Sequence, residues 1–290
     1  MIQGTTKLLG VIGDPIEHSL SPVMHNAAIA EMGVDYVYLP FPIKSTDLDA
    51  ALAGFSAMGL EGFNVTIPHK QAIVSRLSHV SKLAEAVGAV NTVWRTDRGW
   101  EGTNTDVVGF IAPLKEINNN HQFWREKTAI ILGNGGASRA VVAGCAELGI
   151  RNIFVVGRNR EKLDIFQQSW LDSPLSLSLN VETWDSLPEM IHQADLLVNT
   201  TPVGMYPHVE NSPVTEAVMD GLKSDAIAYD LIYTPNPTQF LSLAKAKGAI
   251  IIDGLEMLVQ QGATALELWL KQPVPVDVMR QSLHKKLGLL

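Results

Sequence analysis

The stretch "GFNVTIPHK", residues 62–70, places hydrogen-bonding side chains at the end of an apolar strand pattern. Asn64 and Thr66 are neutral groups that can bind hydroxyls, and Lys70 follows after the break at Pro68. A lysine ammonium can hold an oxygen that gains negative charge and can donate a proton to it. On this stretch alone, an exposed lysine after a proline turn is the default interpretation of Lys70.

Three further polar clusters lie in the same part of the chain, each at an inferred strand end or helix start. "HSLSP" contains Ser19 and Ser21, "AVNTVW" contains Asn91, and "GTNTD" ends at Asp106. These hydroxyl, amide and carboxylate groups show no metal-ligand spacing, and with Lys70 they suit a small polyhydroxylated acid. Their convergence with a dinucleotide loop makes Lys70 a candidate acid/base.

That loop follows a β-branched strand in "TAIILGNGGAS", residues 128–138. Gly133, Gly135 and Gly136 allow a tight turn and a close approach to a pyrophosphate, and the following helix offers free N–H groups. Ser138 takes the place of the third glycine or alanine. A strand before the loop and a helix after it favour dinucleotide binding over a turn without a ligand.

The end of the next strand indicates which dinucleotide binds. An NAD enzyme usually has Asp or Glu there, whereas this chain has Arg158 and Arg160, with Lys162 nearby. A guanidinium can bind a 2′-phosphate in a bidentate manner, so NADP is favoured, with Arg158 the better placed. The alternative is that these arginines only solvate a helix start.

The stretch "VNTTPVGM", residues 198–205, ends another strand of this part of the chain. Strand ends in open α/β sheets face the ligand crevice, so Asn199, Thr200, Thr201 and the backbone to Met205 are candidates for the nicotinamide side. A capped turn made by Asn and Thr explains each single residue equally well.

Composition sets wider limits on function. The 290 residues are 46% hydrophobic and 18% charged, with a formal net charge of −8, which argues against binding to nucleic acid or anionic membranes. Cys145 is the single cysteine and cannot form an internal disulfide. No signal peptide or membrane-spanning apolar run is expected, so the predicted location is the cytoplasm.

Alternating strand and helix patterns predict an α/β fold. The first series is strand 7–13, helix 21–33, strand 36–41, helix 45–59 and strand 62–67. The second series is a strand from 128, a helix to about 149, strands 152–158, 196–201, 226–233 and 248–254, and an apolar helix 255–270.

At this level of detail the chain resembles the shikimate dehydrogenase family. The motifs are "GDPIEHSLSPVMHN", "NVTIPHK", "GAVNTV", "GTNTD", "GNGGASRA", "NTTPVGM" and "DGLEMLVQQ", in the family's order. The resemblance implies an N-terminal three-layer α/β substrate domain, residues 1–106, completed by final helices in 255–290. A Rossmann-like NADP-binding domain would span 107–254. The implied activity is reversible NADPH-dependent reduction of 3-dehydroshikimate to shikimate, on the route to chorismate and the aromatic amino acids.

Carried over position by position, the resemblance implies a substrate site in the first domain. Lys70 would be the acid/base, and Asp106 would bond to the reacting end of the substrate. The serines of "HSLSP" would hold the substrate carboxylate, and the other members would bind ring hydroxyls or orient their neighbours. The implied substrate-binding set is Ser19, Ser21, Asn64, Thr66, Asn91, Tyr233 and Gln261.

The same resemblance implies an NADP(H) site in the second domain and no metal site. The glycine loop would hold the pyrophosphate, Arg158 the 2′-phosphate, and Met205 would pack near the nicotinamide. The implied cofactor-binding set is Gly133, Asn134, Gly135, Gly136, Ala137, Ser138, Arg158, Lys162, Thr200, Met205 and Gly254.

The chain departs from the family pattern at three places around this cofactor site. The usual GAGGAS loop has Asn134 in its second position, and the usual NRT motif reads Gly157-Arg158-Asn159. Lys162 stands where a second arginine is common and lacks the guanidinium fork. We therefore expect altered contacts around the adenosine ribose phosphate. His18, His25 and His69 are expected to be partly exposed structural residues.

Three alternatives remain open from the sequence. A quinate/shikimate dehydrogenase often prefers NAD and has an acidic residue near position 158, which this chain lacks. A metabolite-sensing regulatory protein would be free to lose Lys70 or Asp106. A folate-type NADP dehydrogenase would not need the serines of "HSLSP". The expected assembly is a monomer or a homodimer.

Overall fold

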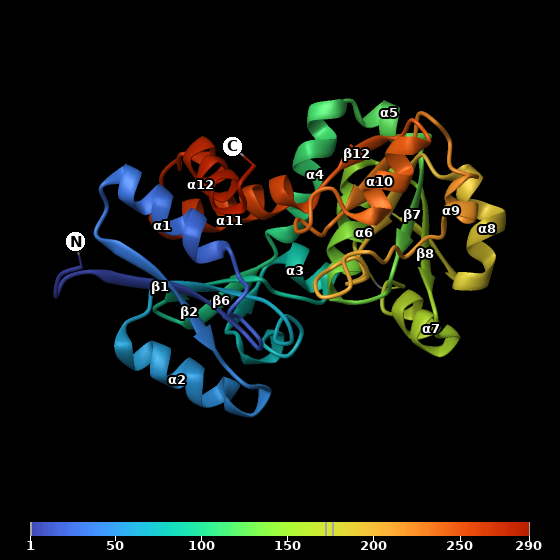
Figure 1. The fold of residues 1–290 in the computed structure, drawn as a ribbon. Coiled ribbons are helices and arrows are strands. Elements are labelled where there is room, and N and C mark those ends of the chain that lie inside the picture. Colours follow the sequence, from blue (N-terminus) through green and yellow to red (C-terminus); the bar gives the residue numbers. More distant parts are fainter. Residues whose placement is uncertain (1, 172, 176, 290) are drawn as a thin grey trace. The chain divides into compact units, whose positions relative to one another are not determined.

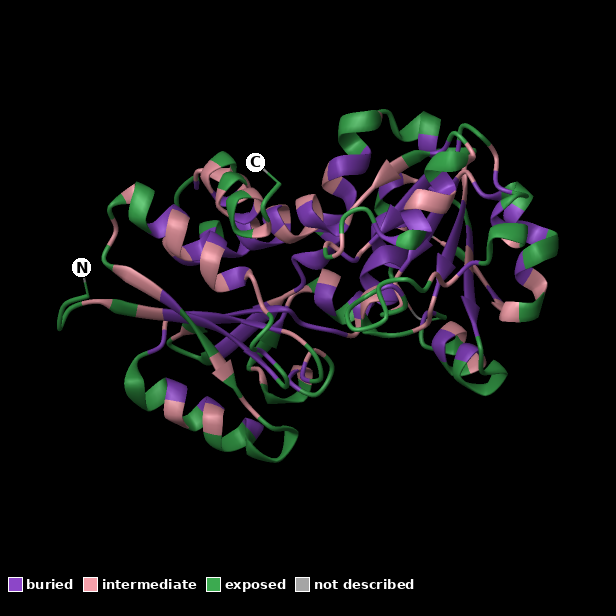
Figure 2. Cartoon of the chain, in the orientation of Figure 1, coloured by how far each residue is buried: buried purple, intermediate pink, exposed green. Residues whose placement is uncertain are grey.

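Two six-stranded sheets, one in each of two units, organise the chain (Figure 1). The computed structural model describes residues 2–171, 173–175 and 177–289. The first unit comprises Met1–Gly109 and Leu258–Leu290, and the second comprises Phe110–Met257. In each unit the buried residues concentrate along the sheet, and the exposed residues lie on the outer faces of the helices (Figure 2).

The sheet of the first unit mixes parallel and antiparallel strands, in the order β2-β1-β3-β5-β6-β4. β1 pairs in parallel with β2 and β3, whereas β5 runs antiparallel to both β3 and β6. The strands are β1 (Lys7–Gly13), β2 (Tyr36–Pro42), β3 (Gly62–Val65), β4 (His79–Val80), β5 (Thr92–Thr96) and β6 (Gly99–Thr103). The antiparallel part was not predicted from the sequence.

Helices cover both faces of this sheet, so the first unit has three layers. Figure 1 shows α1, α11 and α12 on one face and α2 on the other. Leu48, Leu52 and Phe55 of α2 pack with Phe63 of β3 in a buried core cluster. The helices are α1 (Ser21–Met32), α2 (Leu48–Met58), α3 (Lys82–Val87), α11 (Gly254–Leu270) and α12 (Val276–Leu287). The 3-10 turns are Ser45–Asp47 and Val74–Arg76.

The C-terminal helices belong to the first unit because their apolar side chains close its core. The Trp269 indole donates to the Val93 carbonyl at 2.9 Å and occupies the space beside Gly62, where a Cβ would collide with it. Met279 and Leu283 of α12 are fully buried. The predicted return of the final helices to the first part of the chain is therefore confirmed.

The sheet of the second unit is entirely parallel, in the order β12-β11-β10-β7-β8-β9. Its central strands are buried on both faces, as apolar runs such as "TAIIL" predict. The strands are β7 (Thr128–Leu132), β8 (Asn152–Gly157), β9 (Ser178–Thr183), β10 (Leu196–Asn199), β11 (Ile227–Asp230) and β12 (Ile250–Ile252). This topology confirms the predicted Rossmann-like class.

The helices of the second unit include long connections and short turns. They are α4 (Asp106–Ile117), α5 (His121–Arg125), α6 (Gly136–Leu148), α7 (Arg160–Gln168), α8 (Leu187–Met190), α9 (Glu216–Met219) and α10 (Gln239–Ala246). The 3-10 turns are Trp184–Ser186 and Ile191–Gln193. The division between the two units falls within α4 and within α11. Within the described ranges no helix is long and apolar enough to cross a membrane.

Several strands end earlier than the sequence predicted, for a local reason. β10 stops at Asn199 and β11 at Asp230, where the side chain accepts a hydrogen bond from the backbone N–H two residues on. These Asx turns compete with the sheet ladder and turn the chain away from it. The polar residues after the strands therefore lie in loops.

Candidate active site

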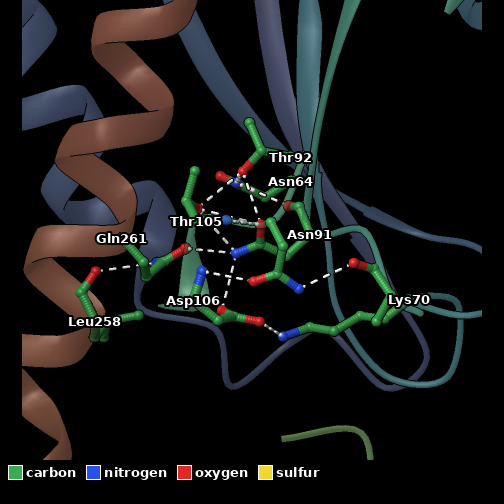
Figure 3. A network of polar contacts seen from close by, with 10 residues as sticks. Asn64, Lys70, Asn91, Thr92, Thr105, Asp106, Leu258 and Gln261 are labelled. Atoms are coloured by element: carbon green, nitrogen blue, oxygen red, sulfur yellow. Dashed lines mark hydrogen bonds and ion pairs between the residues drawn. The ribbon is translucent and has the colours of Figure 1, made fainter. Parts of the chain in front are cut away.

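Lys70 and Asp106, which the sequence analysis paired, are in direct contact in the first unit. Lys70 Nζ donates to Asp106 Oδ2 at 2.6 Å, and the side chains are 22% and 12% exposed (Figure 3). Lys70 lies in the turn after β3, where its carbonyl accepts from the Val90 amide at 2.8 Å. Asp106 begins α4, and its own amide donates to Asn104 Oδ1. Each charged group is thus held by its backbone as well as by its partner.

Asn91 fixes the other side of the Asp106 carboxylate. Its Nδ2 donates to Asp106 Oδ1 at 2.8 Å and lies within 3.3 Å of Gln261 Oε1 (Figure 3). Its Oδ1 accepts from the Thr105 amide at 2.7 Å, which sets the orientation of the Asn91 amide group. Both carboxylate oxygens of Asp106 therefore accept hydrogen bonds, as an ionised carboxylate can.

Asn64 of β3 extends the network toward Tyr38 of β2. Its Nδ2 donates to the Asn91 carbonyl and to Thr92 Oγ1, and its Oδ1 accepts from the Tyr38 hydroxyl at 2.7 Å. Both of its donors are occupied within the protein, so only its carbonyl oxygen has capacity left for a ligand hydroxyl. Asn64 was expected to bind such hydroxyls; its free capacity is that of an acceptor.

Three members of this network were not identified from the sequence. Tyr38, Thr92 and Thr105 are almost fully buried and supply hydroxyls to Asn64 and Asn91. Thr92 and Thr105 stand next to Asn91 and Asp106 in "AVNTVW" and "GTNTD", so their position was the available signal. Tyr38 lies in an ordinary strand pattern that carries no such signal.

The serines of "HSLSP" lie at the start of α1 in the same unit. The Ser21 amide donates to Ser19 Oγ at 3.3 Å, and Ser21 is buried, whereas Ser19 is partly exposed. Burial raises the pKa of Tyr38 well above its ordinary value, and a hydrogen bond with Ser21 partly offsets this effect. Ser21 therefore contacts the phenol that orients Asn64.

Thr66 and Gln261 complete the substrate candidates of the first unit. Thr66 is partly exposed, and its hydroxyl makes no hydrogen bond with the rest of the described chain. Gln261 projects from α11, where its Nε2 donates to the Leu258 carbonyl at 3.0 Å (Figure 3). Thr66 is thus open to a ligand hydroxyl, whereas Gln261 is anchored beside Asn91.

The expectation that all three histidines are partly exposed is wrong for two of them. His25 and His69 are fully buried, and only His18 is exposed. The His25 ring stacks on Tyr38 with centroids 4.1 Å apart, and burial lowers its pKa to about 3. Its neutral ring therefore packs against the phenol at physiological pH.

The glycine loop of the second unit forms a cradle in which Asn134 carries the one side chain between Gly133 and Gly136. Gly133 has φ 102°, and a Cβ there would lie 2.8 Å from Thr200 Oγ1. Gly135 and Gly136 have no neighbouring atom within 4 Å of an added Cβ. No side chain caps α6 at Gly135, which leaves its first N–H groups available to a ligand. These features fit a pyrophosphate at a helix N-terminus.

The small residues after this cradle tie it to the helix. Ser138 is buried, and its hydroxyl donates to the Gly135 carbonyl at 2.6 Å, while Ala137 is partly buried beside it. This hydrogen bond holds the first turn of α6 against the loop, as the small-residue position predicts.

The basic residues after β8 differ in their partners. Arg160 pairs with Asp164 at 2.8 Å along α7, and the Asn159 side chain caps the same helix by accepting from the Lys162 amide. Arg158 and Lys162 are exposed, and Arg158 makes no ion pair within the described ranges. Arg158 therefore keeps a free guanidinium directly after the strand.

A buried polar cluster organises the loops after β10 and β11. Asn199 Nδ2 donates to Asp230 Oδ1 at 3.0 Å, and Thr238 donates to Asp230 Oδ2 at 2.7 Å. Burial raises the pKa of Asp230 to about 6. Asn199 is completely buried, so for this residue the capped-turn interpretation holds and a direct contact with nicotinamide does not. Asp230 was not identified from the sequence.

The remaining candidates of the second unit lie around this cluster. Thr200 donates to the Leu132 carbonyl at 2.7 Å, Met205 is 47% exposed, and burial raises the pKa of Tyr233. Gly254 starts α11 where a Cβ would collide with the Leu231 carbonyl, so it allows a close backbone approach. Met205 thus offers an exposed apolar side chain, whereas Gly254 has a packing role.

Family models and full-length relatives match this chain. The shikimate dehydrogenase substrate binding domain matches residues 11–93, and the shikimate 5′-dehydrogenase C-terminal domain matches residues 254–284. A shikimate dehydrogenase (NADP(+)) from Nostoc sp. is 61% identical over 290 residues and covers 100% of each chain.

Solved structures give the same picture at lower identity. A shikimate dehydrogenase in complex with NADP+ has a TM-score of 0.89 and 35% identity, covering 99% of this chain and 98% of that chain. The enzyme from Thermus thermophilus in complex with NADP(H) and shikimate has a TM-score of 0.84 and 31% identity, covering 97% and 99%.

Proposed function

The chain belongs to the shikimate dehydrogenase family and reversibly reduces 3-dehydroshikimate to shikimate with NADPH, and we propose that Lys70 and Asp106 transfer the proton in this reaction. The observation that carries the assignment is the contact of Lys70 Nζ with Asp106 Oδ2 at 2.6 Å. The other carboxylate oxygen of Asp106, Oδ1, already accepts a hydrogen bond from Asn91. The pair therefore presents one oriented ammonium at the edge of the substrate-domain sheet.

NADPH, when bound, supplies the hydride. As the substrate carbonyl is reduced, its oxygen gains negative charge, and the Lys70 ammonium holds this oxygen and donates a proton to it. Asp106 keeps the ammonium oriented, while Asn91 keeps Asp106 in place. In the reverse direction Lys70 accepts the proton from the shikimate hydroxyl.

The substrate assignments are proposals that the geometry of the first unit supports. Ser19 and Ser21 would hold the carboxylate at the start of α1, where backbone N–H groups also favour an anion. Thr66 would donate or accept with its free hydroxyl, and Asn64 would accept through its one available lone pair. Asn91 and Gln261 would support these contacts from within the network, and Tyr233 stays a substrate-binding candidate from the sequence.

The cofactor assignments are proposals for the second unit. Gly133 to Ser138 would bind the pyrophosphate, because the cradle has open space and free N–H groups. Arg158 would bind the 2′-phosphate, with Lys162 adding positive charge nearby. Thr200 would fix the loop and Met205 would pack near the nicotinamide, while Gly254 would allow α11 to start close to the loop.

The roles of the two units follow from the same assignments. We propose that Met1–Gly109 with Leu258–Leu290 binds the substrate and that Phe110–Met257 binds NADP(H). A cytoplasmic location and a monomeric or homodimeric state remain predictions from the sequence.

One experiment separates this function from the broad quinate/shikimate enzyme. Initial rates are measured with shikimate or quinate and with NADP or NAD, in all four pairings. Turnover confined to shikimate with NADP is expected from the free guanidinium of Arg158. Comparable rates with quinate or NAD would contradict the assignment, and binding without turnover in any pairing would indicate a sensor.

A further inference from the structure

A side chain at Gly157, the last residue of β8, would crowd its neighbours. Its φ is not among the positive values that favour glycine, so its backbone conformation is open to any residue. A Cβ at this position would lie 2.9 Å from Leu163 Cδ2 and 3.2 Å from Asn134 Oδ1. The Asn134 amide therefore occupies space that a side chain at position 157 would need.

The place where these two residues meet has a defined use in a dinucleotide-binding sheet. The side chain at the end of the second strand of such a sheet contacts the adenosine ribose. β8 is the strand that follows the glycine-loop strand β7 along the chain and pairs with it. At its end, Gly157 offers no side chain and Arg158 offers a guanidinium, so neither residue supplies a neutral group that can both donate and accept.

Asn134 carries such a group on the glycine loop itself. It stands between Gly133 and Gly135, its side chain is partly exposed, and no hydrogen bond engages that side chain within the described ranges. An amide can donate to a phosphate or hydroxyl oxygen and can accept from a ribose hydroxyl. A carboxylate in the same place would repel a 2′-phosphate.

We propose that Asn134 is a specificity-determining residue for NADP(H), supplying from the glycine loop the amide that position 157 cannot supply to the adenosine ribose and its 2′-phosphate. Gly157 permits this arrangement, because the absence of a side chain there leaves room for the Asn134 amide. The inference rests on the proposed cofactor site of the second unit.

The first test measures binding by isothermal titration calorimetry with NADP+, NAD+ and 2′,5′-ADP. Asn134→Ala should weaken NADP+ binding by about tenfold and NAD+ binding by less than about threefold, since one charge-assisted contact is lost. Asn134→Asp, which keeps the shape, should weaken NADP+ and 2′,5′-ADP binding on the order of a hundredfold while leaving NAD+ within about threefold. An unchanged NADP+/NAD+ ratio in both variants would overturn the proposal.

The second test is a double-mutant cycle between the two positions. Gly157→Asn alone should weaken NADP+ binding, because its side chain meets Asn134. In the Asn134→Ala background the same change should restore binding to within about threefold of the wild type. A side chain at position 157 also displaces Leu163. This cost is the same in the wild-type and in the Asn134→Ala background, so it cancels in the cycle. Additive effects would show that a side chain at position 157 does not take over the function of the Asn134 amide.

The controls separate this inference from the cofactor assignment. Thermal unfolding of each variant shows whether it is folded, and Asn134→Asp is the arm least affected by packing. If the wild-type protein binds NAD+ as well as NADP+, the cofactor assignment fails and the inference fails with it. If the wild type prefers NADP+ and the variants keep that preference, only the inference fails.

Discussion

Asp106→Asn tests whether the carboxylate organises the proton-transfer site. Lys70 Nζ donates to Oδ2 at 2.6 Å, and Asn91 Nδ2 donates to Oδ1 at 2.8 Å. An asparagine has one acceptor and one donor group on its amide, so it can satisfy only one of these two neighbours. The other neighbour then meets a donor instead of an acceptor. The substitution preserves shape and removes one specific function.

The size of the effect follows from the contacts that are lost. A hydrogen bond to a charged group contributes about 1.5–3 kcal/mol, and the facing donors add a repulsive contact. The side chains are 22% and 12% exposed, so solvent screens part of the ionic attraction. We expect a loss of about 2–4 kcal/mol in transition-state stabilisation, which lowers kcat by about 30- to 1000-fold.

The assay follows NADPH absorbance with 3-dehydroshikimate at saturating concentrations. Asp49→Asn is the matched control, because Asp49 lies in the same unit and pairs with Arg76 at the exposed surface. The control should leave kcat within about twofold, as exposed ion pairs contribute little. If Asp106→Asn also stays within about threefold of the wild type, Asp106 does not organise the site and the reasoning is wrong.

Three further substitutions test other parts of the account. Burial raises the pKa of Asp230 to about 6, so between about pH 4 and pH 6 the native carboxyl binds a proton that the unfolded carboxyl has released. The contribution of Asp230 to stability therefore falls by about 3 kcal/mol as pH rises through this window. Asp230→Asn should remove this pH dependence of stability, measured by thermal unfolding. An unchanged pH dependence would contradict the burial argument. Gly133→Ala should lower stability by about 1–3 kcal/mol and weaken NADPH binding, because φ is 102° and Thr200 is close; an unaltered NADPH titration would exclude a role of this turn in the cradle. Tyr38→Phe leaves Asn64 Oδ1 without its donor and should lower stability by about 1–2 kcal/mol. It should also raise the KM for shikimate more than it lowers kcat. A KM equal to that of the wild type would count against this orienting role.

Local motifs explain why much of the site could be predicted from the sequence. The glycine loop can be recognised because its residues are consecutive in the sequence. The structure places it between β7 and the start of α6, as expected. Lys70 and Asp106 were paired because their types complement each other and their motifs resemble one family. Their contact at 2.6 Å depends on the hairpin of β5 and β6, which the sequence patterns did not predict.

The unpredicted residues are those whose role arises only from folding. Asp230 is the direct partner of the candidate Asn199 in the parallel pairing of β10 and β11, so the two side chains meet although they are far apart along the chain. Tyr38 reaches Asn64 only because β2 and β3 flank β1 in register. Periodicity reports that such residues are buried, but it does not report which neighbour they meet.

The most direct test of the central claim is the turnover of Lys70→Ala. We expect kcat to fall by about a thousandfold or more, while NADPH and shikimate dissociation constants change by less than about fivefold. Thermal unfolding confirms that the variant is folded, and calorimetry supplies the two dissociation constants. A kcat within about tenfold of the wild type, with binding intact, would show that another group transfers the proton.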